Sequence, residues 1–326
     1  MFSGFLENSK QEILNKLNEL NIELNQTKEL TDSRRVLLAC SGGADSLALL
    51  TILHAIDVDF SVCYVEHGLN EETQQAVNYL AELCGALNID FYEQSIHMSD
   101  AEKESNLEAN ARRLRYEALE EVRIKDNADV IATAHHQDDL AETFLINLIR
   151  GSGSGGVSLA KERNNIIRPV LGCRKSQLEA LVEYCSLNPI IDPSNAELIF
   201  VRNRIRHEAI PLLDEISNRD VTELLVRASQ IIKEDSDYID TVAQICWPKE
   251  EASTKALREL DIVLQKHALR NWIQGMPPSS EEIERILKVV NHEIKATQIS
   301  GNRTIRRSGG VLYQDITDTE LKEKHD

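Results

Sequence analysis

Short apolar runs and stretches of helical periodicity alternate along the chain up to about residue 190. Apolar runs bounded by polar residues predict strands at 35–40, 60–65, 89–94, 129–134 and 166–170. Helical spacing of apolar residues predicts helices at about 5–25, 46–56, 71–87, 106–124, 138–150 and 174–187. Because strands that alternate with helices form right-handed βαβ units, the pattern predicts an α/β fold with a doubly wound, mostly parallel five-stranded sheet.

The pattern changes near residue 200, where strand signals give way to charged, helical sequence. Helical periodicity there predicts segments at 200–217, 220–246, 251–274 and 279–295. The sequence TIRRSGGVLY at 304–313 predicts a basic turn between two short strands. We therefore predict two domains, 1–216 and 217–326, of which the second is mainly helical.

The stretch VLLACSGGADSLALL, residues 36–50, predicts a buried strand that breaks into a loop and opens a helix. Glycines let a backbone approach an anion closely, and the N–H groups at a helix start attract phosphate. Hydroxyls and one acid add donors and a metal ligand or helix cap. An ordinary capped turn is the alternative for a lone glycine pair. The predicted phosphate-binding residues are Ser41, Gly42, Gly43, Ala44, Asp45 and Ser46.

The loop differs from a Walker A loop, which ends in a lysine that this stretch lacks. In doubly wound sheets, ligands bind beyond the carboxyl ends of the strands at the switch point. We expect the loop to lie there.

A second stretch, residues 129–156, places two histidines and two acids where a predicted strand ends and a helix begins. These are His135, His136, Asp138 and Asp139, and helical spacing puts Glu142 one turn further on. Such a group can hold Mg²⁺, bind an ammonium group or transfer protons, although an acid at a helix start is also a common cap. Zinc is disfavoured because adjacent histidines do not converge easily and no HExxH or cysteine pair is present.

Composition narrows the cellular setting. No apolar segment reaches membrane-spanning length, and the N-terminus lacks a basic region followed by an apolar core, so we expect a cytoplasmic protein without membrane contact. The six cysteines are scattered without a CxxC pair, which indicates buried thiols in a reducing compartment. The sequence does not determine the oligomeric state, and a homodimer is one assembly to consider.

The net charge of −18 opposes nonspecific nucleic-acid binding. Arginines nevertheless cluster at 112–115, 202–206 and 303–307. Such clusters can hold a particular RNA locally while acid elsewhere keeps the protein soluble, although each one alone is also typical of a solvated helix face.

SGGADS resembles the SGGxDS signature of the PP-loop ATP-pyrophosphatase superfamily, whose members cleave ATP between the α and β phosphates. The whole set of motifs is similar to the tRNA(Ile)-lysidine synthetase family. In chain order these are SGGADS, VEHGLN (65–70), NLEANARRLRY (106–116), AHHQDDLAET (134–143), RGSGSGG (150–156), RPVL (168–171), DPSN (192–195) and RNRIR (202–206).

The resemblance implies a two-step ligation by an N-terminal ATP-binding catalytic domain and a C-terminal tRNA-binding domain. The wobble cytidine of a tRNA(Ile) with a CAU anticodon is adenylated by ATP with Mg²⁺. The amine of free L-lysine then displaces AMP from C2 and forms lysidine.

The resemblance also assigns roles to residues. Catalytic roles fall to His135, Asp138, Asp139, Arg202 and Arg204. Nucleotide or tRNA phosphate contacts fall to Arg112, Arg115 and Arg206, and His67 is expected at the adenine or ribose edge. Asp45 and Asp138 are the predicted Mg²⁺ ligands.

Three alternatives stay open. A tRNA thiolase shares the loop but needs cysteines to carry sulfur, often as CxxC pairs. A nitrogen ligase of the NAD or GMP synthetase type shares the loop and the adenylation. A non-enzymatic nucleotide-binding regulator would leave the cluster at 135–142 idle.

Overall fold

The computed structural model describes residues 2–66, 71–98, 107–151, 165–190, 201–249 and 252–316. Internal contacts divide the chain into two compact units. Unit 1 comprises Met1–Ile146 with Ala160–Val226, and unit 2 comprises Asn147–Leu159 with Arg227–Asp326. Each unit is described by itself.

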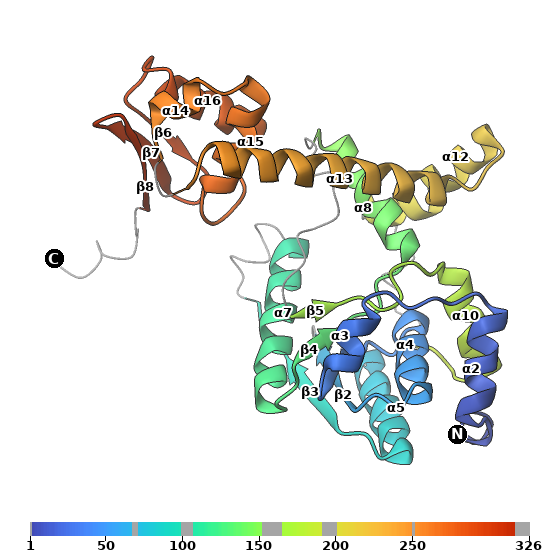
Figure 1. Ribbon diagram of the computed structural model, residues 1–326. Helices are drawn as coiled ribbons and strands as arrows, with labels where there is room; N and C mark the ends of the chain where they lie inside the picture. Colours follow the sequence, from blue (N-terminus) through green and yellow to red (C-terminus); the bar gives the residue numbers. More distant parts are fainter. Residues whose placement is uncertain are drawn as a thin grey trace. The chain divides into compact units, whose positions relative to one another are not determined.

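Unit 1 contains the parallel five-stranded sheet that the apolar runs predict (Figure 1). Its strands are β1 (Val36–Ala39), β2 (Phe60–Glu66), β3 (Phe91–Ser95), β4 (Val130–Ala132) and β5 (Ile166–Ile167), in the order β3-β2-β1-β4-β5. Leu38 of β1 pairs with Val62 on one side and with Ala132 on the other. The strand order therefore reverses between β1 and β4, which makes their carboxyl ends the switch point of the sheet.

Helices cover both faces of this sheet, as a doubly wound fold requires (Figure 1). One face packs Val36, Leu38 and Val62 against helices α2, α4, α5 and α10, whereas the other packs Leu37 and Cys63 against α7. The predicted fold class is confirmed. The bounds are α2 (Lys10–Glu19), α4 (Ala44–Ala55), α5 (Glu71–Leu87), α7 (Leu107–Lys125), α8 (Gln137–Ile149) and α10 (Lys175–Tyr184).

The single N-terminal helix predicted at 5–25 is wrong. The segment forms α1 (Ser3–Glu7), α2 and α3 (Thr27–Asp32). The chain breaks after α1 because Ser9 caps α2: its side chain accepts from the N–H of Glu12, whose carboxylate accepts from the N–H of Ser9. Apolar periodicity carries no information about such a cap.

The segment predicted as a helix at 200–217 contains α11 (Val201–Arg204), the π-helical turn η2 (Ile205–Ala209) and α12 (Ile210–Ser217). The wider turn comes just before Pro211, which lacks an N–H and crowds the preceding turn. Helix α13 (Val221–Cys246) follows.

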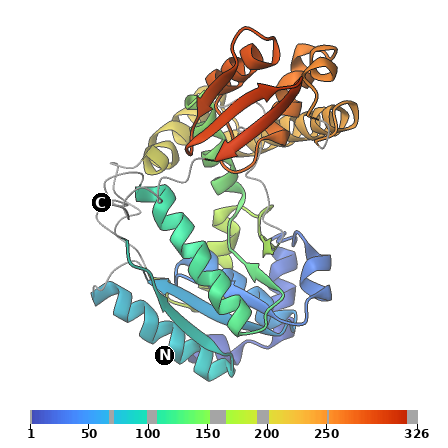
Figure 2. The same ribbon diagram turned by 90° about the vertical axis from the view of Figure 1, so that its left-hand side faces the viewer.

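Unit 2 packs helices against a small antiparallel sheet of order β6-β7-β8, whose red strands face the viewer in Figure 2. Trp247, Leu269, Ile286, Ile305 and Leu312 are buried in its core. The predicted basic turn is the β7–β8 connection at Gly309 and Gly310. The remaining bounds are α14 (Thr254–Arg258), α15 (Ile262–Trp272), α16 (Ser280–Val290), β6 (Ala296–Ile299), β7 (Arg303–Ser308) and β8 (Val311–Ile316).

The helix predicted at 251–274 is two helices, because Asp261 accepts a hydrogen bond from the N–H of Val263 and starts α15 anew. No helix in the described part of the chain is both long and apolar enough to cross a membrane.

The amino end of the unit 1 sheet is held by charge. Arg35 pairs with Asp126, whose carboxylate also accepts hydrogen bonds from the hydroxyls of Ser61 and Tyr92 at 2.5 and 2.7 Å.

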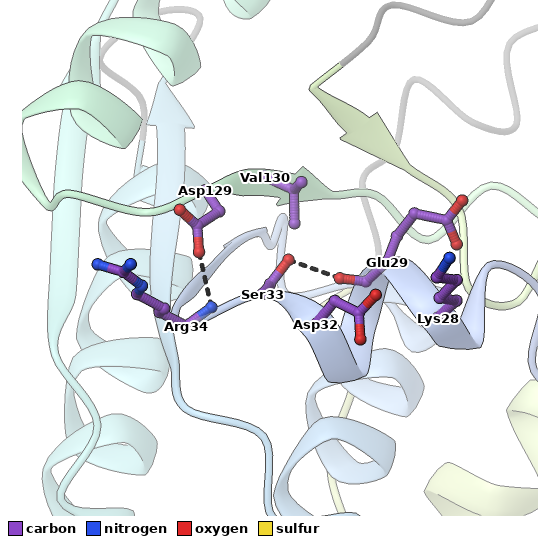
Figure 3. Close-up of a pocket in the computed structure, with 7 residues that line it drawn as sticks. All are labelled: Lys28, Glu29, Asp32, Ser33, Arg34, Asp129 and Val130. Carbon is purple, nitrogen blue, oxygen red and sulfur yellow. Dashed lines mark hydrogen bonds between the residues drawn. The ribbon is translucent and has the colours of Figure 1, made fainter.

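An open hollow lies at the same end of the sheet, as Figure 3 shows, and there the N–H of Arg34 donates to Asp129 at 2.6 Å. These residues precede β1 and β4, so the hollow lies at the opposite end of the strands from the switch point.

Candidate active site

The loop between β1 and α4 has the backbone that close approach to an anion requires. Gly42 has a φ of +80°, and a Cβ added there would lie 3.2 Å from Cδ1 of Ile190. The N–H of Ile190 donates to the carbonyl of Gly42 at 2.9 Å. Conformation and space both favour glycine at this position.

Helix α4 begins directly after this loop, at Ala44, with Gly43 as its N-cap. Because glycine has no side chain to cap the helix, the first N–H groups of α4 can face an anion. Ser46 is buried and its hydroxyl donates to the carbonyl of Gly43 at 2.9 Å, which stabilises the turn. Ser41 is exposed, with its hydroxyl 3.5 Å from that of Ser46. The structure therefore brings all six predicted loop residues together.

His136 lies at the centre of three carboxylates next to this loop. Its side chain is 1% exposed. Nε2 lies 3.5 Å from both Asp45 and Asp139, and Nδ1 lies 3.4 Å from Asp138. These distances are at the outer limit of hydrogen bonding, so the attraction is mainly between charges. Elements far apart in the sequence meet here because the carboxyl ends of β1 and β4 are adjacent.

The charges in this group stabilise one another. Burial alone would lower the pKa of His136, but the three carboxylates outweigh it and raise that pKa to about 10. Burial likewise opposes ionisation of Asp138 and Asp139. His136 and nearby cations outweigh it and lower the pKa of both carboxyl groups. The His136 ring is therefore a cation, and Asp138 and Asp139 are anions, at neutral pH.

Two of the acids differ in what they can still bind. Oδ1 of Asp45 is buried and has no hydrogen-bond partner among the described residues. Both carboxylate oxygens of Asp138 already have partners. Oδ1 pairs with Arg174 at 3.0 Å, and Oδ2 accepts a hydrogen bond from the N–H of Lys175 at 2.8 Å. Asp138 thus ties the start of α8 to the start of α10. Asp45 fits a Mg²⁺ ligand, whereas Asp138 fits a positioning role.

Among the described residues, no three His, Cys, Asp or Glu side chains are arranged so that they could hold a metal ion by themselves.

A second charged cluster adjoins the first. Glu142 is fully buried and accepts from Nε of Arg202 at 2.8 Å and from Nε of Arg206 at 2.5 Å. Nη2 of Arg206 lies 3.5 Å from Oδ1 of Asp139, and that of Arg202 lies 3.9 Å from it. One carboxylate therefore orients two arginines toward Asp139. The sequence interpretation noted the position of Glu142 but assigned it no role.

Arg204 lies outside this cluster, in contrast to its predicted catalytic position. Its side chain is 63% exposed and pairs with Glu208. Helical geometry explains the difference, because residues four apart share a face and a residue midway between them points away. Arg202 and Arg206 have that spacing.

His135 occupies a different environment from His136. Its Nδ1 lies 2.9 Å from the hydroxyl of Thr133. Burial lowers the pKa of His135 to about 4 despite Asp139, and the positive charges of Arg168, Arg112 and Arg202 act in the same direction as burial. His135 is therefore neutral at neutral pH.

The remaining predicted residues lie around this group. Arg112 on α7 is exposed and lies over the ring of Tyr116, with its guanidinium 5.1 Å from the ring centre. Arg115 is exposed on the same helix. His67 and the DPSN motif lie outside the described residues. Arg168 and Arg174 received no predicted role, although the RPVL motif pointed to the first.

Comparison with known proteins places this geometry in a family. Residues 11–213 match the PP-loop domain. The chain belongs to the PP-loop family. The glycine loop between β1 and α4 is therefore its PP loop.

Two curated relatives of this PP-loop chain share the name tRNA(Ile)-lysidine synthase. The chain is 36% identical over 231 residues to the tRNA(Ile)-lysidine synthase of Clostridioides difficile. The match covers 68% of this chain and 50% of the relative. The chain is 29% identical over 287 residues to the tRNA(Ile)-lysidine synthase of Thermosipho africanus. That match covers 85% of this chain and 66% of the relative. The chain thus spans about half to two thirds of the length of these relatives.

A solved structure supports the fold of the PP-loop unit. The U34-tRNA thiolase from Methanococcus maripaludis superposes with a TM-score of 0.54 at 16% identity, covering 68% of this chain and 80% of that protein. At this identity the likeness concerns the fold alone.

Proposed function

We propose that this PP-loop chain is an AMP-forming ligase that attaches lysine to C2 of the wobble cytidine of tRNA(Ile) with a CAU anticodon. The observation that carries the proposal is the Glu142–Arg202–Arg206 cluster facing Asp139 beside the PP loop. The names of the curated relatives support the same reading. ATP, free L-lysine and Mg²⁺ complete the reaction, and the cytoplasm is the proposed location.

In the first step, the cytidine O2 attacks the α-phosphorus of ATP and pyrophosphate leaves. The N–H groups at the start of α4 and the Ser41 hydroxyl hold the departing phosphates. Mg²⁺ held by Asp45 would neutralise phosphate charge. Arg202 and Arg206, already oriented by Glu142, stabilise charge that develops on the α-phosphate.

In the second step, the lysine amine attacks C2 and AMP leaves. The ammonium group has a pKa near 10.4 in water and must first lose a proton. Because cations hold Asp139 ionised, it can bind the ammonium group. The same lowered pKa makes Asp139 a weak base, so proton transfer to it requires that the bound ammonium be made more acidic as well. The same cations, His136, Arg202 and Arg206, favour the neutral amine once it is bound. Neutral His135 adds no further positive charge against the incoming ammonium.

Sulfur transfer is the weaker alternative. Five of the six cysteines are buried, and only Cys246 is exposed. Burial raises the pKa of Cys40, Cys63 and Cys173, which leaves these thiols protonated and unreactive. A sulfur carrier needs an accessible thiolate.

The test is lysine incorporation. The protein is incubated with ATP, labelled lysine and unmodified tRNA(Ile) bearing CAU, and a tRNA with U34 is the control. We expect label only in the first tRNA, and Asp139→Asn should abolish it. ATP–pyrophosphate exchange without lysine incorporation would overturn the proposal and favour another PP-loop activity.

A further inference from the structure

Glu66, the last residue of β2, is a buried carboxylate with one oxygen to spare. The residue is 4% exposed. Oε2 accepts the hydroxyl of Ser95 at 2.9 Å, whereas Oε1 is buried without a hydrogen-bond partner among the described residues. A buried carboxylate oxygen without a donor costs free energy, so in native proteins such groups bind an ordered water, an ion or a ligand, or serve another function.

The position of Glu66 places it at the ligand end of the sheet. β2 pairs with β1 in parallel, and the N–H of Cys40 donates to the carbonyl of Cys63 at 2.9 Å. The carboxyl end of β2 therefore lies beside the strand that leads into the PP loop. Alternation along β2 puts Glu66 on the same face as Val62 and Tyr64. That face is the one covered by α4, the helix that begins at the PP loop.

The neighbouring strand β3 fixes the orientation of the Glu66 carboxylate. Glu66 pairs in register with Ser95 of β3, and the N–H of Ile96 donates to the Glu66 carbonyl at 3.1 Å. Ser95 holds Oε2 from this outer side, away from β1. A carboxyl oxygen such as Oε1 of Glu66 can accept hydrogen bonds, so a ligand that fits it carries a donor.

Glu66 has the same place in its sheet as an acid that binds ribose in dinucleotide-binding sheets. In dinucleotide-binding sheets, the phosphates lie at the glycine loop after the first strand, and an acid about 20 residues later, at the end of the second strand, binds a ribose hydroxyl. Gly43 and Glu66 have a comparable spacing and occupy corresponding strands. We infer that Glu66 accepts a hydrogen bond from a ribose hydroxyl of the ATP whose phosphates occupy the PP loop. This inference rests on the proposed function only in that ATP is the ligand.

Binding of ATP, 2′-deoxyATP and 3′-deoxyATP to the full chain, measured by calorimetry without tRNA or lysine, tests the inference. For the unaltered chain we expect one deoxy analogue to bind about 10-fold more weakly than ATP, as loss of a hydrogen bond to a charged group predicts. In Glu66→Ala that ratio should fall to about one. Glu66→Gln, which keeps the size and one acceptor, should give an intermediate ratio.

Two matched controls isolate the contact. Ser95→Ala keeps the carboxylate but removes its orientation, so the ratio should shrink less than in Glu66→Ala. Glu93→Gln, on the neighbouring strand β3, should leave the ratio unchanged. Thermal unfolding shows that each variant is folded, and Glu66→Gln carries the test if Glu66→Ala is not.

The inference is overturned if both analogues bind the unaltered chain as tightly as ATP, or if the discrimination survives in the Glu66 variants. Absence of ATP binding by the unaltered chain would overturn the proposed function and this inference together. ATP binding with unchanged discrimination would remove the inference alone.

Discussion

Arg204 and Arg206 are near neighbours in the sequence but make opposite contacts. Arg206 donates to buried Glu142 and faces Asp139, whereas Arg204 pairs with Glu208 at the surface. We expect Arg206→Ala to lower the rate of lysine incorporation about 100-fold, as removal of one oriented donor to a developing charge does. Arg204→Ala should change it less than about threefold, because exposed pairs contribute little. Initial rates at saturating ATP distinguish the two variants. Equal losses would contradict the division of roles drawn from their contacts.

Replacement of glycine by alanine should have opposite effects on the free energy of unfolding at Gly42 and at Gly85. Gly42 has a φ of +80° and Ile190 close by, so Gly42→Ala should lower the free energy of unfolding by about 1–2 kcal/mol. Gly85 lies within α5, where an added Cβ would meet nothing within 4 Å. Gly85→Ala should raise that free energy by about 0.5–1 kcal/mol. Urea unfolding measures both, and a stabilised Gly42→Ala would show that the loop backbone is not constrained as described.

Part of the site could be predicted from local sequence. The loop residues follow from glycine chemistry between a strand and a helix, and Glu142 lies within one helical turn of Asp139. The same rule identifies Arg202 and Arg206 over Arg204, although the sequence interpretation did not apply it. The contacts of Asp138 could not be predicted, because its partners, Arg174 and Lys175, lie at the start of another helix.

Helix α16 depends on a buried acid at its start. Glu282 accepts from Ser279 N–H at 2.7 Å, and from the N–H and hydroxyl of Ser300 at 2.6 Å each. Burial opposes its charge, but these donors outweigh it and lower the pKa of Glu282 to about 2 from an ordinary 4.5. Its contribution to stability is therefore complete above pH 4.5 and disappears as pH falls toward 2.

We accordingly expect Glu282→Gln to lower the free energy of unfolding of unit 2 by about 1–3 kcal/mol at pH 7, with the difference from the unaltered chain closing below pH 4.5. Glu281→Gln, at the exposed neighbouring position, is the control and should behave like the unaltered chain. Denaturant titrations at several pH values provide the measurement. A constant difference from pH 7 to pH 2 would show that the charge of Glu282 is not what stabilises the helix.

Strands and central helices of unit 1 were predictable because apolar runs and helical periodicity report burial directly. The errors fall where polar side chains interrupt helices, at Ser9 and Asp261, and where Pro211 widens a turn. β6 was missed because alternating exposure leaves only Ile299 buried on that edge strand. These features depend on hydrogen bonds and neighbours that periodicity does not record.

The whole chain carries a charge of −18, yet the proposed substrate is a polyanion. Local arginines must therefore make the phosphate contacts, and tRNA affinity should fall steeply with salt, by about 0.7–0.9 in logarithmic slope per contact. Filter binding between 50 and 200 mM salt, a range suited to such contacts, measures this slope, and Arg112→Ala should reduce it by about one contact. A flat response would argue against RNA binding by these clusters.

His136 supplies a counter-ion within the group of three carboxylates beside the PP loop. Without that buried cation, Asp45, Asp138 and Asp139 would repel one another, and folding would have to hold three like charges together. With it, the acids are fixed before any ligand arrives. Little of the binding energy is then consumed in arranging these side chains, so affinity for small ligands can be directed to the reacting groups. The ion pairs of His136 therefore preorganise the three carboxylates.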